Sequence, residues 1–297
     1  MTERVWTLVN PGGGRGRTSK FLVQLRAHAE RSGMRFLVSE STEDLAMHAR
    51  AAAAAGVERL LVAGGDGTLH HAIQGLAGSA TALGILPLGS GNDLAGTLGV
   101  PKELDRALEL GVHGAIERID LVRAGGRYYG GVAGVGFDSE VNRYANERVK
   151  WIKGKMIYPY ATLRWIIPFR APILRVEHDA GVFEGPAMFA VVANSPRYGG
   201  GMFIAPAADL QDGMLDLVIV RKISKLQLLM VFPKVFKGAH VSHPAVTVVR
   251  TRRALLSLSR PIVAYGDGEP LVEVGSEPVA FEVAPRALSV VTGRRSG

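Results

Sequence analysis

The spacing of hydrophobic positions changes part-way along the chain. In the first hundred residues, short apolar runs at 4–9, 36–38, 60–63 and 84–86 alternate with stretches of helical character, such as the alanine-rich run 49–55. Glycine-rich turns follow three of the four apolar runs. Alternation of strand, turn and helix predicts a parallel sheet with helices on its faces.

After residue 116 the apolar positions follow a period of two, joined by Gly or Asp turns. This pattern predicts a mostly antiparallel second domain, either a sandwich or an open barrel. Two helical stretches interrupt it, at 138–169 and at 224–238, where Ser224 and Gln227 have capping-box spacing. The expected strands are 116–124, 127–135, 174–178, 183–194, 245–251, 255–259, 262–265 and 279–283.

Length supports a division into two domains. A chain of 297 residues exceeds what one small hydrophobic core usually needs. We predict an α/β fold: an N-terminal Rossmann-like three-layer α/β domain at 1–115, and a C-terminal, mostly antiparallel β-sandwich at 116–285. The last strand lies in the segment 286–297, for which a return to the first domain stays open.

Several classes of protein are disfavoured by composition. The chain has no cysteine, so a disulfide framework, a Cys-based metal site and a Cys nucleophile are excluded. No apolar run approaches the roughly 18 residues of a membrane-spanning helix. The first residues lack a basic start followed by an apolar run, so they do not resemble a signal peptide. We expect a cytoplasmic protein.

The basic charge is concentrated in the second half of the chain. The formal net charge is +8, and no acidic residue occurs between Asp216 and Asp267. Residues 143–175 carry eight basic residues and one acidic residue. Such an excess favours nucleotides, nucleic acid or anionic lipid surfaces as partners. No nucleic-acid-binding motif is present, so we expect no nucleic acid. The aromatic and basic stretch 143–169 suits either a membrane surface or an amphipathic helix packed between domains.

Three glycine-rich turns follow apolar strands in the first domain, at 10–16, 64–68 and 89–93. Turns after parallel strands lie at one sheet edge, where α/β proteins bind ligands. Glycine lets backbone N–H groups approach phosphate oxygens closely. We therefore predict a phosphate-binding site there. Arg17 breaks the G-x-G-x-x-G pattern, and the Lys-Ser/Thr pair of a P-loop is missing, so the site is of neither standard type.

Six motifs together resemble a known family. In order and over essentially the whole chain, they are similar to the motifs of the diacylglycerol and sphingosine kinase family, and most similar to those of bacterial soluble diacylglycerol kinases. The resemblance implies a fold of the NAD kinase/diacylglycerol kinase type. The Gly-Gly-Asp-Gly-Thr motif is also shared with NAD kinases. The motifs are Asn-Pro-Gly at 10–12, Gly-Gly-Asp-Gly-Thr at 64–68, Pro-Leu-Gly-Ser-Gly-Asn-Asp at 87–93, Gly-Val-Gly-Phe-Asp at 134–138, Asp-Gly-Met-Leu-Asp at 212–216 and Asp-Gly-Glu at 267–269.

The resemblance also implies roles for single residues. Glu269 would be the general base, Asp93 would lie near magnesium-bound phosphates, and Asp120 would belong to an acidic network leading to a structural ion. Asp212, with the backbone carbonyls of Asp209 and Met214, would hold that ion, Mg²⁺. On spacing alone, Glu269 is equally well interpreted as a hairpin turn residue, and Asp212 would be interpreted only as a turn residue. The residues implied to contact ATP are Asn10, Pro11, Gly12, Gly13, Gly14, Ser39 (or Ser41 or Thr42), Gly65, Asp66, Gly67, Thr68 and Ser90. His70 and His71 replace the Asn-Glu pair usual in the family.

The expected function follows from the resemblance. We expect an ATP- and Mg²⁺-dependent lipid kinase that phosphorylates diacylglycerol to phosphatidic acid, in peripheral contact with the anionic inner face of the membrane. A kinase for another lipid (a sphingoid base or monoacylglycerol) or for a soluble substrate such as NAD is an alternative. A non-catalytic nucleotide or lipid sensor is a second alternative. Whether the chain forms a homodimer stays open.

Overall fold

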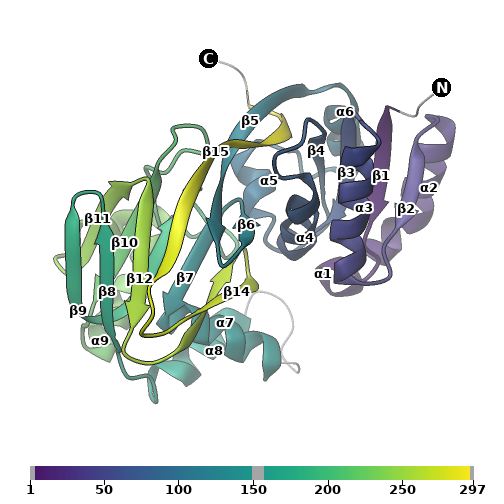
Figure 1. The fold of residues 1–297 in the computed structure, drawn as a ribbon. Helices are drawn as coiled ribbons and strands as arrows, with labels where there is room; N and C mark the ends of the chain where they lie inside the picture. Colours follow the sequence, from purple (N-terminus) through teal and green to yellow (C-terminus); the bar gives the residue numbers. More distant parts are fainter. Residues whose placement is uncertain (1–3, 149–156, 295–297) are drawn as a thin grey trace. The chain divides into compact units, whose positions relative to one another are not determined.

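The computed structural model describes residues 4–148 and 157–294 (Figure 1). Contacts divide the chain into two compact units. Unit 1 comprises Met1–Leu121 with Ala284–Gly297, and unit 2 comprises Val122–Val283. Two strands, β5 (Ala115–Ala124) and β15 (Val279–Thr292), run through both units. The sequence-based boundaries at residues 115 and 285 fall inside these two strands.

Unit 1 alternates strands and helices, as the apolar pattern predicted. Its remaining elements are β1 (Val5–Val9), α1 (Gly13–Gly16), the 3-10 helix η1 (Thr18–Phe21), α2 (Leu22–Arg31), β2 (Arg35–Val38), α3 (Thr42–Ala54), β3 (Arg59–Gly64), α4 (Asp66–Leu76), β4 (Ala82–Pro87), α5 (Asp93–Thr97) and α6 (Leu104–His113).

The strands of unit 1 form a parallel sheet in the order β15–β4–β3–β1–β2. The end of β15 pairs with β4 at Val290 and Leu83. The central strand β3 is buried on both faces, and its run of apolar residues from Leu60 to Ala63 has no exposed surface. Continuous apolar strands of this kind are typical of sheets covered by helices on both sides.

Local signals set the ends of some helices in unit 1. Ser41 caps α3, because its hydroxyl accepts a hydrogen bond from the Asp44 backbone N–H at 3.2 Å. Gly56, which has a φ of +66°, follows the end of that helix. The helix α4 begins at Asp66, directly after the glycine turn that ends β3.

Unit 2 is rich in antiparallel strands. Its remaining elements are β6 (Arg127–Tyr129), β7 (Val132–Gly136), α7 (Phe137–Glu147), α8 (Ile157–Ile166), β8 (Ile173–His178), β9 (Gly181–Ala193), β10 (Leu215–Arg221), α9 (Lys225–Val231), the 3-10 helices η3 (Phe232–Lys237) and η4 (Ala239–Ser242), β11 (Val246–Thr251), β12 (Arg253–Leu258), β13 (Ile262–Gly266) and β14 (Glu269–Val274).

These strands form an antiparallel β-sandwich, as the period-two pattern predicted. In one layer, β12 pairs with β8 and with the first part of β15. The other layer runs β14–β13–β7–β9–β10–β11. The long strand β9 belongs to both layers, because it also pairs with β8. Apolar side chains from both layers form one core, among them Leu174, Val192 and Leu256.

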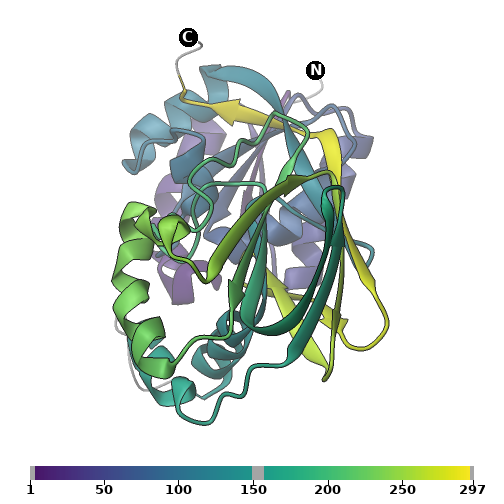
Figure 2. The same ribbon diagram turned by 90° about the vertical axis from the view of Figure 1, so that its left-hand side faces the viewer.

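Helices pack on the outside of the second layer (Figure 2). Phe137, Ile166 and Leu228, from α7, α8 and α9, share a core cluster with Met188 of β9 and Val220 of β10. The single helical stretch predicted at 138–169 was wrong in one respect, because α7 and α8 are separate helices. No helix among residues 4–148 and 157–294 is long and apolar enough to cross a bilayer.

The predicted capping box before α9 is confirmed. The Ser224 hydroxyl accepts from the Gln227 backbone N–H at 3.2 Å, and the Gln227 side-chain oxygen accepts from the Ser224 N–H at 3.0 Å. The α-helix then continues as the 3-10 helix η3, which has a proline in its first turn. Gly238, with a φ of +67°, ends η3.

Candidate functional site

The three glycine turns of unit 1 lie beside one another at the carboxyl edge of its sheet. They follow β1, β3 and β4, which are neighbouring parallel strands. The first turn is joined to α4 by the side chain of Asn10, whose Nδ2 donates to Thr68 Oγ1 at 3.2 Å. Asn10 Oδ1 accepts from the Gly12 backbone N–H at 3.1 Å. A Cβ on Gly13 would lie 3.1 Å from Thr68 Oγ1 and 3.2 Å from Thr18 Oγ1, which is closer than most Cβ contacts.

The second and third turns touch backbone to backbone. A Cβ placed on Gly89 would lie 2.4 Å from the Cα of Gly65, and a Cβ on Gly65 would lie 2.9 Å from the Cα of Gly89. Both distances are too short for a real Cβ contact. Glycine is therefore required at both positions because the two backbones approach so closely.

Asp66 fixes the third turn from the first residue of α4. Its carboxylate accepts hydrogen bonds from the backbone N–H groups of Asn92 at 2.8 Å and Asp93 at 2.9 Å, at the start of α5. A Cβ on Gly91 would lie 2.6 Å from Asp66 Oδ2 and 3.4 Å from Asp93 Oδ2. The two carboxylates therefore both lie against the backbone of Gly91, and the turn carries concentrated negative charge.

Asn92 is a site residue that sequence reasoning did not single out. Its backbone is left-handed, with a φ of +56°. Its side-chain oxygen accepts from the Gly89 N–H at 3.0 Å, and its Nδ2 donates to the Gly89 carbonyl at 3.0 Å. Asn tolerates this conformation better than most residues. Its place in the Gly-Ser-Gly-Asn-Asp motif was the only signal that could have identified it.

The other predicted ATP-contacting residues occupy the same edge or its borders. Ser39 is buried after β2 and its hydroxyl donates to the Val9 carbonyl at 3.4 Å. Ser41, the alternative to Ser39, is engaged as the α3 cap. Ser90 is exposed in the third turn. Pro11 and Gly14 belong to the turn and to α1, and Gly67 belongs to the first turn of α4.

Asp120 lies on β5 and is buried, with 1% of its surface exposed. Its Oδ1 accepts from the backbone N–H of Arg286 at 2.7 Å, where β15 has a left-handed residue. The carboxylate thus ties together two strands of unit 1. Buried carboxylates need such donors because an unpaired buried charge is costly.

In unit 2, Glu269 begins β14 directly after a tight turn and is half-buried. The turn is held by Asp267, whose carboxylate accepts from three backbone N–H groups: Gly130 at 2.9 Å, Gly131 at 2.9 Å and Val132 at 3.2 Å. Asp267 and Gly268 have φ values of +53° and +88°. The turn before Glu269 is therefore anchored to the start of β7 by its own carboxylate.

The resemblance implied a structural ion at the turn 209–214, which carries the carboxylates of Asp209 and Asp212. Asp212 Oδ1 accepts from the Met214 N–H at 2.9 Å, and Asp209 Oδ1 accepts from the Gln211 N–H at 3.0 Å. Arg250 forms an ion pair with the other oxygen of Asp212. Burial raises the pKa of nearby Asp216, and the charge of Asp212 adds to the rise while Arg250 opposes it.

These oxygens are of the kind that a hard divalent cation takes. In this structure one oxygen of Asp212 accepts from the Met214 N–H, and the other is paired with Arg250, which supplies the positive charge beside this carboxylate. In the part of the chain that the structure describes, no group of three or more His, Asp or Glu side chains converges as a metal site. Any ion here would rely on backbone carbonyls as well.

Comparison with known proteins identifies the family. The family model described as diacylglycerol kinase catalytic domain matches residues 4–124. The model described as YegS C-terminal NAD kinase beta sandwich-like domain matches residues 131–292. A diacylglycerol kinase of Mycobacterium tuberculosis is 36% identical over 94% of both chains. The chain belongs to the diacylglycerol kinase-like family of lipid kinases.

Other relatives agree with this assignment. A Bacillus subtilis diacylglycerol kinase is 28% identical over 90% of both chains. A protein of Shewanella frigidimarina named probable lipid kinase YegS-like is 28% identical, over 86% of this chain and 82% of its own. A solved Bacillus anthracis diacylglycerol kinase shares the fold, with a TM-score of 0.73 at 20% identity over 98% of this chain and 97% of its own. The family implies ATP, a lipid substrate and, typically, a divalent metal.

The kinase has an apolar cavity of ≈ 60 Å³ in unit 2, lined by residues of the helices α7, α8 and α9 and of the strands β9 and β10. Asp138, at the second position of α7, lines it together with Tyr198 and His240. The Tyr198 hydroxyl donates to Asp138 Oδ1 at 2.8 Å. Burial raises the pKa of Asp138 to about 6, and the Tyr198 hydrogen bond opposes the rise. The sequence analysis placed Asp138 only in the motif 134–138 and at the start of a helical stretch; its partner lies 60 residues away, so no local signal indicated the contact.

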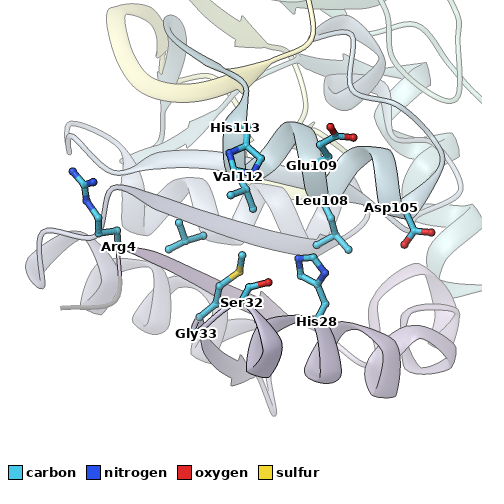
Figure 3. A pocket seen from close by; sticks show the side chains of 11 residues that line it. Arg4, His28, Ser32, Gly33, Asp105, Leu108, Glu109, Val112 and His113 are labelled. Atoms are coloured by element: carbon cyan, nitrogen blue, oxygen red, sulfur yellow. The ribbon is translucent and has the colours of Figure 1, made fainter. Parts of the chain in front are cut away.

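A wider hollow of ≈ 520 Å³ lies in unit 1, between α2 and α6 (Figure 3). His28 and Ser32 line one side, and Asp105, Glu109 and His113 line the other. Arg4 and Val5, at the amino end of β1, also border it, whereas the glycine turns follow the carboxyl ends of the strands. The hollow is therefore separate from the glycine turns, although it is larger than the apolar cavity.

Proposed function

We propose that the kinase transfers the γ-phosphoryl group of ATP to the free hydroxyl of diacylglycerol, giving phosphatidic acid and ADP. The meeting of three glycine turns at one sheet edge, with Asp66 and Asp93 in the second and third of them, carries the nucleotide half of this proposal. The lipid half rests on the M. tuberculosis relative, which is named a diacylglycerol kinase and aligns over 94% of both chains.

The glycine turns are the proposed binding site for the phosphates of ATP. Asn10–Gly14, Gly65–Thr68 and Ser90 would contact ATP, and no Cβ would block the approach of phosphate oxygens to the backbone at the glycines. Asn10 would hold the first turn against Thr68, and Ser39 would border the nucleotide. Asp66 acts mainly as the clamp of the third turn, because both its oxygens accept backbone hydrogen bonds.

Phosphoryl transfer then needs a base and neutralisation of charge. The lipid hydroxyl oxygen forms a bond to the γ-phosphorus, while the bond from that phosphorus to the bridging oxygen breaks and ADP leaves. The hydroxyl proton passes to the carboxylate of Glu269, which we propose as the general base. A carboxylate can serve in this role when it lies within hydrogen-bond reach of the attacking hydroxyl.

We further propose that the metal is Mg²⁺, with Asp93 placed near the metal-bound phosphates. Bound Mg²⁺ would neutralise charge on the phosphates. A structural ion at Asp212, with the carbonyls of Asp209 and Met214, and the buried Asp120 would support the fold. We place the kinase in the cytoplasm, at the inner face of the membrane where its lipid substrate lies.

A soluble substrate such as NAD is the alternative to a lipid substrate that a specific observation supports. The Gly-Gly-Asp-Gly-Thr turn is shared with NAD kinases, and the model matching residues 131–292 is described as NAD kinase beta sandwich-like. The basic excess of the second half of the chain favours the lipid, because a kinase for NAD has no need of a cationic surface toward a membrane.

Transfer of labelled γ-phosphate distinguishes these substrates. The purified kinase would be given ATP, Mg²⁺ and mixed micelles of diacylglycerol, monoacylglycerol, a sphingoid base or ceramide, with NAD as a soluble control. We expect label in phosphatidic acid. Label in another lipid alone would replace diacylglycerol as the substrate, and label in NADP alone would overturn the lipid proposal. ATP binding without transfer to any acceptor would favour a sensor.

A further inference from the structure

Most of the exposed large apolar side chains of unit 2 lie on its helical segments. Of the twelve large apolar side chains exposed among the described residues, six lie on α8, α9, η3 and η4 or directly after α8. The other six are scattered over helices and strands, which is normal for a protein surface. We call the six the α8–α9 face: Leu163 (56% exposed), Ile167 (66%), Leu226 (68%), Met230 (57%), Phe236 (50%) and Val241 (38%).

Helical spacing and one hydrogen bond connect parts of this face. Leu226 and Met230 are four residues apart on α9, so they lie on one side of it, while Leu228 and Val231 are buried on the other side. The Lys225 ammonium donates to the backbone carbonyl of Ile167, which joins the start of α9 to the end of α8. Figure 2 shows the green column of α9 and its 3-10 continuation along the outside of the sandwich.

The face is also cationic. Exposed basic residues lie on or next to the same helical segments as the apolar ones, and the 217–266 segment contains no acidic residue. Near α8, the carboxylate of Glu140 is engaged by Arg260 at 2.9 Å and by the Trp165 indole N–H at 2.8 Å. The exposed basic residues of the face are Arg164, Arg170, Lys222, Lys225, Lys234 and Lys237.

We propose that the α8–α9 face docks the kinase on an anionic lipid bilayer. Leu226, Met230 and Phe236 would enter the boundary between headgroups and acyl chains, while Lys234 and Lys237 would bind anionic headgroups. The inference rests on the proposed function only in that a membrane lipid is the substrate. Within the aromatic stretch 143–169, Tyr144 and Trp165 stack on each other in the α7–α8 packing, so these two rings are not part of the α8–α9 face. Trp151 and the side chain of Tyr158 lie outside the described residues.

A second copy of the chain is a less suitable occupant. A two-fold symmetric interface brings the same patch of both subunits together. The cations of the α8–α9 face would then oppose identical cations, and like charges across an interface are repulsive. An anionic bilayer satisfies both the apolar and the cationic side chains at once.

Sedimentation with lipid vesicles tests the docking surface without any catalytic step. The full-length kinase is mixed, without ATP or diacylglycerol, with vesicles of phosphatidylcholine alone or with added phosphatidylglycerol. Variant L226Q/M230Q/F236Q removes the apolar contacts, and K234Q/K237Q removes two charges. Control V23Q/M47Q alters two exposed apolar residues of unit 1, and control K102Q/R106Q alters two exposed basic residues there. Thermal melting verifies that each variant folds.

We expect wild type to bind the anionic vesicles more tightly than the neutral ones. The apolar triple variant should lose at least about tenfold in partitioning, and the charge variant about fivefold for each lysine removed. Both controls should bind as wild type does. Unchanged vesicle binding in both face variants would overturn the proposal. It would also be overturned if light scattering shows a dimer that dissociates in these variants while vesicle binding persists.

Diacylglycerol phosphorylation in micelles separates this proposal from the proposed function. If wild type labels diacylglycerol but the face variants bind vesicles normally, the docking surface is wrong and the substrate stands. If wild type does not label diacylglycerol but the face variants lose vesicle binding, the substrate is wrong and the docking surface stands.

Discussion

The carboxylate of Asp66 accepts a hydrogen bond from the backbone N–H of Asp93 at 2.9 Å, across 27 residues of chain. The same carboxylate accepts from Asn92 at 2.8 Å. One side chain at the start of α4 therefore satisfies two N–H groups at the start of α5, and the glycine turn after β4 is held in one conformation. Asp66 thus organises the candidate site instead of only bordering it.

Replacing Asp66 should loosen this turn. For Asp66→Ala we expect the free energy of unfolding to fall by about 1–3 kcal/mol, because two partly buried N–H groups lose a charged acceptor. ATP affinity should fall at least about tenfold, equivalent to about 1.4 kcal/mol. Calorimetric ATP titration and denaturant unfolding measure these changes. Glu103→Gln, an exposed acidic residue of unit 1, is the matched control; equal ATP affinity in both variants would contradict the clamp.

Asp267 should act through Glu269. Asp267→Asn preserves a side chain that tolerates a positive φ but removes the charge that accepts three N–H groups. We expect the free energy of unfolding to fall by about 1–3 kcal/mol. We also expect kcat to fall, while the dissociation constant for ATP stays unchanged. Steady-state kinetics alongside ATP titration test this split. The exposed Glu277, changed to Gln, provides the control; a loss of ATP binding in Asp267→Asn would show that the turn does more than hold Glu269.

The pKa of Asp138 predicts how stability depends on pH. Burial raises this pKa from 3.8 to about 6 in the folded chain, so the folded state binds more protons than the unfolded state between these values. Its contribution to stability is therefore present below pH 3.8 and is lost as pH rises through about 6. Compared with wild type, Asp138→Asn should gain about 1–3 kcal/mol in free energy of unfolding between pH 4 and pH 7.5.

Denaturant unfolding at both pH values measures this effect. Tyr198→Phe is the companion variant, because it removes the hydrogen bond that lowers the Asp138 pKa. In that variant the loss of stability should extend to higher pH. Parallel pH profiles of wild type and Asp138→Asn would exclude a perturbed carboxyl at this position.

The turn at 209–214 predicts a response to Mg²⁺. An ion that binds only the folded state, present at about 10- to 100-fold above its dissociation constant, stabilises by about 1.4–2.7 kcal/mol. We expect Mg²⁺ to raise the melting temperature of wild type and a chelator to reverse the rise. Asp212→Asn should abolish the response, whereas Asp209→Asn should keep it, because Asp209 would contribute only its backbone carbonyl. Equal responses in both variants would place the ion elsewhere.

Much of the architecture could be predicted from local patterns. Continuous apolar strands with glycine turns indicated the parallel sheet, because strands buried on both faces are apolar at every position. Strands with a period of two indicated the sandwich, because only one face of such a strand is buried. The meeting of the three glycine turns also followed from parallel topology. Contacts between distant residues could not be predicted: no local signal shows that Asp66 caps α5 or that Tyr198 binds Asp138. The α8–α9 face likewise depends on which side of each helix the core covers.

The roles of single residues could not be predicted from local patterns. Glu269, Asp93, Asp120 and Asp212 were assigned from the resemblance, and their functions stay predictions. The structure supplies their surroundings: a clamped turn before Glu269, a backbone donor for buried Asp120 and an arginine beside Asp212. These surroundings decide which variants are informative.

The most direct test compares two glutamates of one strand, Glu269 and Glu273, in phosphate transfer to diacylglycerol. Glu273 is exposed on β14, so Glu273→Gln is the matched control. With labelled ATP, Mg²⁺ and diacylglycerol micelles, wild type and Glu273→Gln should label phosphatidic acid at similar rates. Glu269→Gln should be slower by about 10²- to 10⁴-fold with ATP binding intact. Wild-type rates in Glu269→Gln would contradict its role as the base, and no labelled phosphatidic acid from wild type would contradict the proposed reaction itself.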